Sequence, residues 1–326
     1  MRFSIEFPNA REGVFVPLHF ATPEQIIEVV QHAEKMGFWG AWTTDFVTPT
    51  PMYGIPAGDK PDWYEALISI AFCAAHTSKI KLGTGLLLAS FRDPVILAKQ
   101  VATIDQFSKG RMLLGLGLGM CRDEFEALMP RKAKAHRGNM MDELIELVIR
   151  LCSDEESVTY EGKYNAIKDV KLYPKPVQKP LPIYVPCRAE DSYERIAKWG
   201  LGITTPAGAM KKHTAALAPL LEQNGRKLSD IDVMVEGEVF FGKTREDAAE
   251  RYAKTTHGQF RLKRQPLEQF LEHNWVGTTQ QILEKMLKLK EQGTKHFSVL
   301  HVPAETVGER KELMQRISEE LMPKLG

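Results

Sequence analysis

Residues 80–119 read IKLGTGLLLASFRDPVILAKQVATIDQFSKGRMLLGLGLG, and this stretch decides the fold. The apolar run over 80–87 predicts one strand, and the run over 112–116 predicts another. Between them, Asp93 and Pro94 are typical of the capping residue and the first position of a helix. A strand, a helix and a second strand in this order form the repeating unit of a parallel sheet with crossover helices.

The same alternation continues in both directions from this unit. Strands are predicted over 2–7, 39–43, 80–87, 112–116, 182–185, 202–205, 232–241 and 296–302, each followed by a helical pattern. Eight parallel strands are the number that closes a barrel whose interior is filled by side chains. We therefore expect an α/β protein, a (β/α)8 TIM barrel with insertions, over one domain covering residues 1–326.

Some segments do not fit the alternation. Residues 119–135 and 256–276 are predicted insertions, and 158–167 is a predicted hairpin. A long Pro-rich loop over 46–61 follows the second strand. Barrel enzymes carry their chemistry on the loops at the carboxyl ends of the strands, so we expect a substrate beneath the loops 46–61 and 256–276.

Composition excludes several classes of protein. The 43 Lys and Arg residues nearly balance the 42 Asp and Glu residues, which gives no bulk field to attract nucleic acid or an acidic membrane. The four cysteines are scattered without a CxxC pair, which suits a reducing cytoplasm, where we expect the protein. Histidines and cysteines show no zinc-like spacing, so no metal site is predicted.

Titratable residues follow several predicted strands on the catalytic side of the barrel. Thr44 and Asp45 come directly after the second strand, where Asp45 either acts as an acid, base or ring-nitrogen partner or caps a turn. His301 ends the last strand and is either catalytic or structural. Glu236 and Glu238 share one face of a strand: if it faces inward they are buried carboxylates with raised pKa, and if outward they are ordinary polar contacts.

The segment after the fifth predicted strand opens a helix with the features of an anion site. Arg188, Ala189 and Ser192 would supply free backbone N–H groups, the positive end of the helix dipole, a cation and a hydroxyl. The alternative is an ordinary helix cap, because Asp191 and Ser192 both favour that position.

The glycine-rich segment 115–119 reads GLGLG and lacks the third glycine of a Rossmann turn. Two interpretations remain for it. Either the backbone must pass closely by a neighbour there, or a flat ring packs on the glycines.

Together these motifs resemble a known family, the luciferase-like monooxygenases. The resemblance rests on KLGTG at 81–85, DPV at 93–95, ATIDQFSKGR at 102–111, GLGLG at 115–119, RG at 137–138, YPKPVQ at 173–178, PIYV at 182–185 and VGT at 276–278. It implies a barrel with insertions that binds a flavin or a deazaflavin, and a homodimer.

The resemblance also implies roles for individual residues. Thr84 and Gly85 align with a non-proline cis peptide beneath the ring, and Gly117 aligns near its reactive edge. Arg188, Ala189 and Ser192 fall where family members hold the cofactor phosphate.

The residues after the second strand depart from the family's patterns. Bacterial luciferase has a catalytic histidine near this point, where the present chain has Thr44, Asp45 and Phe46. Members that use the deazaflavin coenzyme F420 often have Asp followed by His, and only Asp45 is kept.

The leading hypothesis is a two-component monooxygenase in which reduced FMN comes from a partner flavin reductase and one oxygen atom of O2 enters a small organic substrate. The first alternative is an F420-dependent oxidoreductase that transfers hydride without oxygen, with Asp45 or His301 as proton partner. The second is a flavin-binding barrel without catalysis. The sequence does not identify the substrate.

Overall fold

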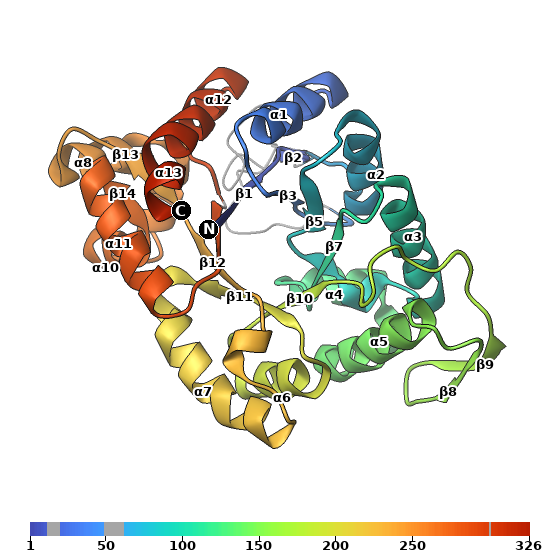
Figure 1. Cartoon of the computed structure of the whole chain (residues 1–326). Coiled ribbons are helices and arrows are strands. Elements are labelled where there is room, and N and C mark those ends of the chain that lie inside the picture. Colours follow the sequence, from blue (N-terminus) through green and yellow to red (C-terminus); the bar gives the residue numbers. More distant parts are fainter. Residues whose placement is uncertain (12–19, 49–61, 300) are drawn as a thin grey trace.

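The computed structural model describes residues 1–11, 20–48, 62–299 and 301–326, and a closed barrel of eight parallel strands lies at its centre (Figure 1). Neighbouring strands pair in the order β10-β11-β12-β15-β1-β3-β5-β7, and a further pairing of β7 with β10 closes the ring. The predicted (β/α)8 TIM barrel is confirmed. Its strands are β1 (Arg2–Glu6), β3 (Gly40–Thr43), β5 (Lys81–Thr84), β7 (Met112–Gly117), β10 (Ile183–Pro186), β11 (Gly202–Pro206), β12 (Val233–Gly237) and β15 (His296–Val299).

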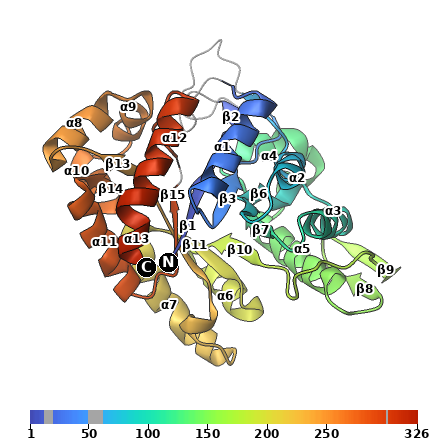
Figure 2. The ribbon, with the colours of Figure 1, turned by 45° about the horizontal axis from the view of Figure 1, so that its top comes forward.

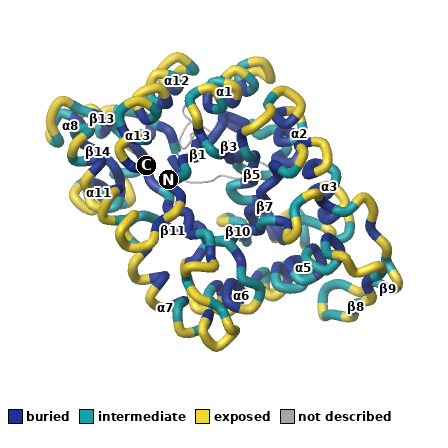
Figure 3. The backbone as a smooth tube through the Cα atoms, in the orientation of Figure 1, coloured by how far each residue is buried: buried dark blue, intermediate teal, exposed yellow. Residues whose placement is uncertain are grey.

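Helices surround the barrel, with their buried sides toward the strands and their exposed sides outward (Figures 1 and 3). Local signals start them as predicted: the Asp93 carboxylate accepts hydrogen bonds from the backbone N–H groups of Val95 and Ile96, both at 2.9 Å, and Pro94 follows it. The helices of this layer are α1 (Pro23–Lys35), α2 (Ala66–His76), α3 (Pro94–Phe107), α5 (Arg137–Cys152), α6 (Glu190–Trp199), α7 (Met210–Gln223), α11 (Thr279–Glu291) and α12 (Val307–Arg316).

Large side chains fill the lower interior of the barrel. The rings of Trp42 and Tyr184 meet edge to face with their centroids 5.4 Å apart, and Leu113 and Met234 complete this cluster. Gly83 makes room for the indole, because a Cβ atom there would come within 2.3 Å of Trp42. At this level the barrel interior is therefore filled by side chains.

One predicted strand, 232–241, is wrong as a single element. It divides into β12, which ends at Gly237, and β13 (Val239–Phe241), which leaves the barrel and pairs with β14 (Trp275–Gly277). We call residues 239–277 the insert; it also contains α8 (Arg245–Lys254), α9 (Thr256–Leu262) and α10 (Leu267–His273). It lies beside the barrel (Figure 2).

The predicted insertion 256–276 is thus larger, and the helical pattern that follows the predicted strand 232–241 belongs to it, as α8, rather than to the helical layer. The insert has a small apolar cluster of its own, formed by Ala248, Ala249, Tyr252, Phe270, Leu271 and Val276.

Shorter elements complete the described chain. They are β2 (Ala10–Arg11), β4 (Asp62–Trp63), β6 (Leu87–Leu88), β8 (Val158–Glu161), β9 (Ala166–Val170), α4 (Arg122–Leu128), α13 (Met322–Leu325), the 3-10 turns 89–91, 130–132, 207–209 and 228–230, and the π-turn 317–321. The hairpin of β8 and β9 was predicted. Of the predicted loop 46–61, residues 49–61 lie outside the described residues. Within the described ranges, no helix combines the length and the apolar character that crossing a membrane requires.

Candidate functional site

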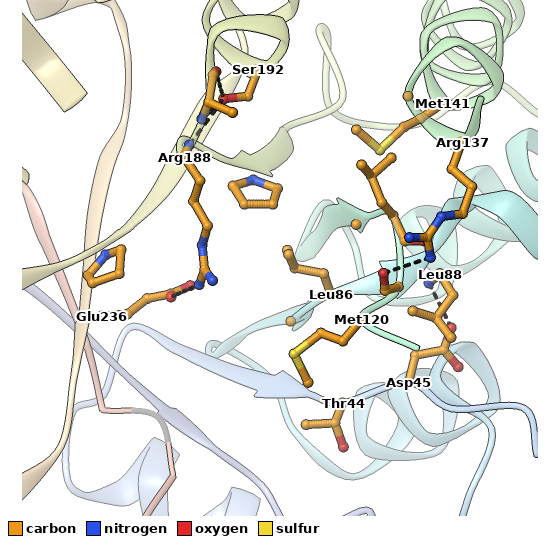
Figure 4. Close-up of a pocket in the computed structure, with 18 of the residues that line it drawn as sticks. Thr44, Asp45, Leu86, Leu88, Met120, Arg137, Met141, Arg188, Ser192 and Glu236 are labelled. Carbon is orange, nitrogen blue, oxygen red and sulfur yellow. Dashed lines mark hydrogen bonds and ion pairs between the residues drawn. The ribbon is translucent and has the colours of Figure 1, made fainter. Parts of the chain in front are cut away.

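A cavity of about 990 Å³ opens at the carboxyl ends of the barrel strands (Figure 4). Its lining comes from the segments after β3, β5, β7, β10, β12 and β15, from the start of α5, and from the insert. This volume is at the upper end of the range for small-molecule sites, which is sufficient for a ring cofactor together with a small substrate. The site thus lies where the fold predicts it.

Glycines form one wall of this cavity. Gly85, Gly117 and Gly119 line it next to Leu86, and a Cβ atom on Gly117 would come within 3.1 Å of the Leu86 Cβ atom. A Cβ atom on Gly115 would come within 2.0 Å of the Thr84 carbonyl oxygen, so the backbone passes closely by a neighbour, as the first interpretation of GLGLG predicted. The second interpretation, a flat ring packed on the glycines, stays a prediction.

The non-proline cis peptide lies one residue later than the resemblance implied. It joins Gly85 to Leu86, whereas Thr84 still belongs to β5. The Thr84 hydroxyl donates to the carbonyl of Gly115 at 2.7 Å and accepts from its N–H at 2.9 Å, so Thr84 is held inside the barrel and does not line the cavity. Gly85 and Leu86 line the cavity in its place.

The start of α6 faces the cavity with the predicted anion-binding groups. The backbone N–H groups of Arg188 and Ala189 both donate to the Ser192 hydroxyl at 3.0 Å. Ser192 therefore caps the turn, and the two N–H groups are gathered at the positive end of the helix. The Arg188 side chain extends across the cavity toward Glu236, with 3.7 Å between their charged atoms (Figure 4).

Two further arginines, from α5 and α6, line the cavity. Arg137, at the start of α5, donates to the carbonyls of Leu118 and Gly119 at 3.2 and 3.0 Å, which places its guanidinium over the glycine wall. Arg195 of α6 is buried against Asp142 of α5. Sequence reasoning did not single out these two arginines, although the Arg137-Gly138 motif marked the first.

Asp45 and Thr44 line the cavity, but other parts of the protein hold their polar atoms. The buried Asp45 carboxylate accepts from the backbone of Leu88 at 2.9 Å and from the Arg92 guanidinium at 2.8 Å. Burial raises its pKa, and Arg92 opposes this shift. The Thr44 hydroxyl donates to Asn9 at 3.1 Å. This geometry suits residues that fix the segments after β3 and β5.

His301 lines the cavity just after β15. Its backbone N–H donates to Glu6 at 3.2 Å, and its ring lies 6.0 Å from that of the buried His257, centroid to centroid. Burial, together with the nearby His257 and Arg261, lowers the pKa of His301 to about 3. The imidazole is therefore neutral at ordinary pH and can accept a proton.

Glu236 and Glu238 both line the cavity, so the inward alternative holds for both. Burial raises the pKa of Glu236, while Arg188 opposes the shift. The expected raised pKa is wrong for Glu238: burial favours the neutral acid, but the attraction of His257, Arg261 and His301 outweighs it and lowers the pKa. Among the described residues, no group of three or more His, Cys, Asp or Glu side chains is arranged to hold a metal ion.

Known proteins resemble this chain over nearly its whole length. Residues 1–319 match the model of the family described as luciferase-like monooxygenase. An F420-dependent glucose-6-phosphate dehydrogenase from Microbacterium testaceum is 26% identical, with 93% of this chain and 94% of that protein covered. Another from Kineococcus radiotolerans is 30% identical over 70% of this chain and 67% of its own length.

The fold has a close structural counterpart. A monooxygenase from Streptomyces bottropensis matches all of this chain and all of its own, with a TM-score of 0.78 and 22% sequence identity. At this identity the likeness concerns the barrel architecture alone.

Proposed function

The chain belongs to the luciferase-like monooxygenase family of oxidoreductases, and from this premise we propose that it is an F420-dependent enzyme that transfers hydride to or from a small organic substrate without using oxygen. The observation that carries the cofactor choice is the similarity to F420-dependent dehydrogenases along most of the chain. F420 therefore replaces FMN, the cofactor of the leading hypothesis from the sequence. The relatives are enzymes, so we do not retain the hypothesis of a barrel without catalysis.

The cavity supports this assignment by its shape and charge. The glycine wall with Gly85, Leu86 and Gly117 would hold the deazaflavin ring, which when bound accepts or delivers a hydride. The side chain of F420 carries a phosphodiester and carboxylates, and so it is more anionic than that of FMN. The Arg188 guanidinium at the start of α6 would bind the phosphodiester, and Arg137 adds a second cation to the cavity lining.

Hydride transfer from an alcohol also releases the hydroxyl proton, and we assign its acceptor to His301. The electron pair of the C–H bond leaves as hydride while the O–H proton passes to a base. His301 lines the cavity as a neutral imidazole, and the nearby Glu238 carboxylate would stabilise the imidazolium that forms when the ring takes the proton. Asp45 is the weaker candidate, since its oxygens already accept hydrogen bonds from Arg92 and Leu88.

The substrate in this proposal carries an anionic group. Arg261, Arg264 and His273 of the insert line the cavity, and glucose 6-phosphate is the substrate named for the relatives. A phosphate or carboxylate would be attracted to this part of the lining.

Cofactor titration of the purified protein tests the proposal. We expect F420 fluorescence to change on binding with a dissociation constant in the micromolar range or below, and FMN to bind about tenfold more weakly or worse. Tight binding of reduced FMN with oxygen uptake, and no binding of F420, would restore the monooxygenase hypothesis.

A further inference from the structure

Glu238 occupies the point at which the chain leaves the barrel, between the end of β12 and the start of β13. Its backbone groups both bond to the far end of the insert. The Glu238 N–H donates to the Asn274 side-chain oxygen at 2.9 Å, and its carbonyl accepts from the N–H of Trp275 at 2.9 Å. The two ends of the insert are thus joined at this residue.

The side chain of Glu238 also turns to the insert. Tyr252 donates its hydroxyl to Oε2 at 2.7 Å, and His257 Nε2 lies 3.0 Å from the same oxygen. The Arg261 guanidinium reaches Oε1 at 3.1 Å. The Glu238 side chain is only 2% exposed. A buried carboxylate is tolerated only when partners such as these replace its hydration.

These partners connect α8 and α9 to the rim of the cavity. Tyr252 belongs to α8, while His257 and Arg261 belong to α9. Arg261 lines the cavity together with Glu238 and His301. One carboxylate at the end of a barrel strand therefore holds a cation of the insert next to the proposed proton acceptor.

Two ring contacts hold other parts of the insert. At its base, Trp275 packs on Phe297 of β15 with 5.6 Å between ring centroids. Farther out, Tyr252 stacks on Phe270 at 4.3 Å within the insert's own cluster. Helix α9 is tied to the segment after β15 by Thr256, whose hydroxyl donates to Glu305 at 3.1 Å, and it contacts Glu238 on the cavity side.

We propose that Glu238 is a positioning residue that docks α9 on the barrel rim and so fixes Arg261 at the substrate side of the cavity, beside His301. The identity of the ligand that meets Arg261 rests on the proposed function. The docking itself does not rest on the proposed function, because it is a property of the protein without cofactor.

Hydrogen exchange of the cofactor-free protein tests the docking. In Glu238→Gln we expect amides of residues 256–273 to exchange roughly tenfold faster than in the wild type, while amides of the barrel strands keep their rates. Glu236→Gln is the matched control, because this carboxylate lies two residues earlier and pairs with Arg188 instead of the insert. Unchanged exchange in Glu238→Gln, or equal acceleration in both variants, would overturn the proposal.

Two milder variants cover the case in which Glu238→Gln does not fold. Tyr252→Phe and Arg261→Gln each remove one partner of the carboxylate and leave the other two. Faster exchange limited to 256–273 in either variant supports docking by Glu238, and wild-type exchange in both contradicts it.

The role of Arg261 is tested by ligand binding, with glucose 6-phosphate as the probe. We expect Glu238→Gln and Arg261→Gln each to weaken its binding about tenfold and the double variant to weaken it no further, since the two residues act as a unit. Arg261→Lys should restore part of the affinity, and the affinity for F420 should stay unchanged in all four. Additive losses, or a wild type that does not bind the probe, would overturn this role; absence of F420 binding would instead overturn the proposed function.

Discussion

At the scale of single residues, Asp45 and His301 both line the cavity, but they differ in their surroundings. The Asp45 carboxylate accepts hydrogen bonds from Arg92 and Leu88, while His301 directs a neutral ring to the cavity lining. These surroundings are the reason that Asp45 is assigned to holding the rim and His301 to the proposed proton transfer.

Replacing Asp45 with Asn should therefore lower stability. The change removes one charge of a buried ion pair and leaves Arg92 with Glu65 as its remaining counter-ion. We expect the free energy of unfolding to fall by about 2–4 kcal/mol, as measured by urea denaturation. A variant as stable as the wild type but without turnover would instead make Asp45 a catalytic residue.

Replacing His301 with Gln should lower kcat by about two to three orders of magnitude and leave the dissociation constant for F420 unchanged. Because the His301 pKa is about 3, the neutral base persists as pH falls, and kcat/KM should show no loss attributable to this residue above roughly pH 4. Steady-state rates across pH check both statements. A variant with wild-type kcat would remove His301 from the mechanism.

His296 should make the fold sensitive to acid. It is fully buried at the base of the barrel, 2.6 Å from the Ser4 hydroxyl, and burial lowers its pKa to about 3. The unfolded chain, with a histidine pKa of about 6.5, binds the proton first. Stability therefore falls as pH drops from about 6.5 toward 3, by about 1.4 kcal/mol per pH unit from this group. In His296→Asn the free energy of unfolding should fall less steeply with decreasing pH than in the wild type, as measured by denaturation at several pH values. An equal slope in both would contradict this role of His296.

At the scale of elements, the start of α6 combines a structural cap with the proposed anion site. Ser192 accepts from two backbone N–H groups, whereas the Arg188 side chain is 60% exposed. At the start of α6, the Ser192 hydroxyl therefore stabilises the helix, and the Arg188 guanidinium would bind the anion.

Arg188→Ala should weaken F420 binding about tenfold without changing the melting temperature of the cofactor-free protein. Ser192→Ala should also weaken F420 binding, and it should lower the free energy of unfolding by about 1 kcal/mol because it removes a helix cap. Lys198→Ala is the control on the same helix, since Lys198 is exposed, pairs with Glu146 and does not line the cavity. Equal F420 affinity in Arg188→Ala and Lys198→Ala would contradict the phosphate assignment.

Elements with local signals were predictable, and those set by distant partners were not. The cap of α3 at Asp93 and the eight strands follow from residues close together in the chain. The break after β12 does not, because β13 leaves the barrel to pair Val239 with Trp275. Likewise, no spacing in the sequence brings Tyr252 and His257 to Glu238, and only the folded chain does so.

At the scale of the whole molecule, the near-zero net charge conceals a basic cavity. The chain has a formal net charge of +1, yet the cavity lining includes Arg122, Lys134, Arg137, Arg188, Arg195, Arg261 and Arg264, against Asp45, Asp191, Glu236 and Glu238. Barrel closure produces this uneven distribution, since it brings the ends of strands and the insert around one space. Composition gives the net charge of the chain, but it says nothing about where the cations gather.

The central claim is hydride transfer to F420 without oxygen, and turnover under two atmospheres tests it most directly. Oxidised F420 is mixed with the protein and glucose 6-phosphate, or with a series of other anionic alcohols, and its visible absorbance is followed under nitrogen and under air. The proposal predicts that at least one alcohol bleaches F420 at the same rate in both atmospheres, with no oxygen uptake. Turnover that requires oxygen and reduced FMN, with F420 unchanged by every alcohol, would contradict it.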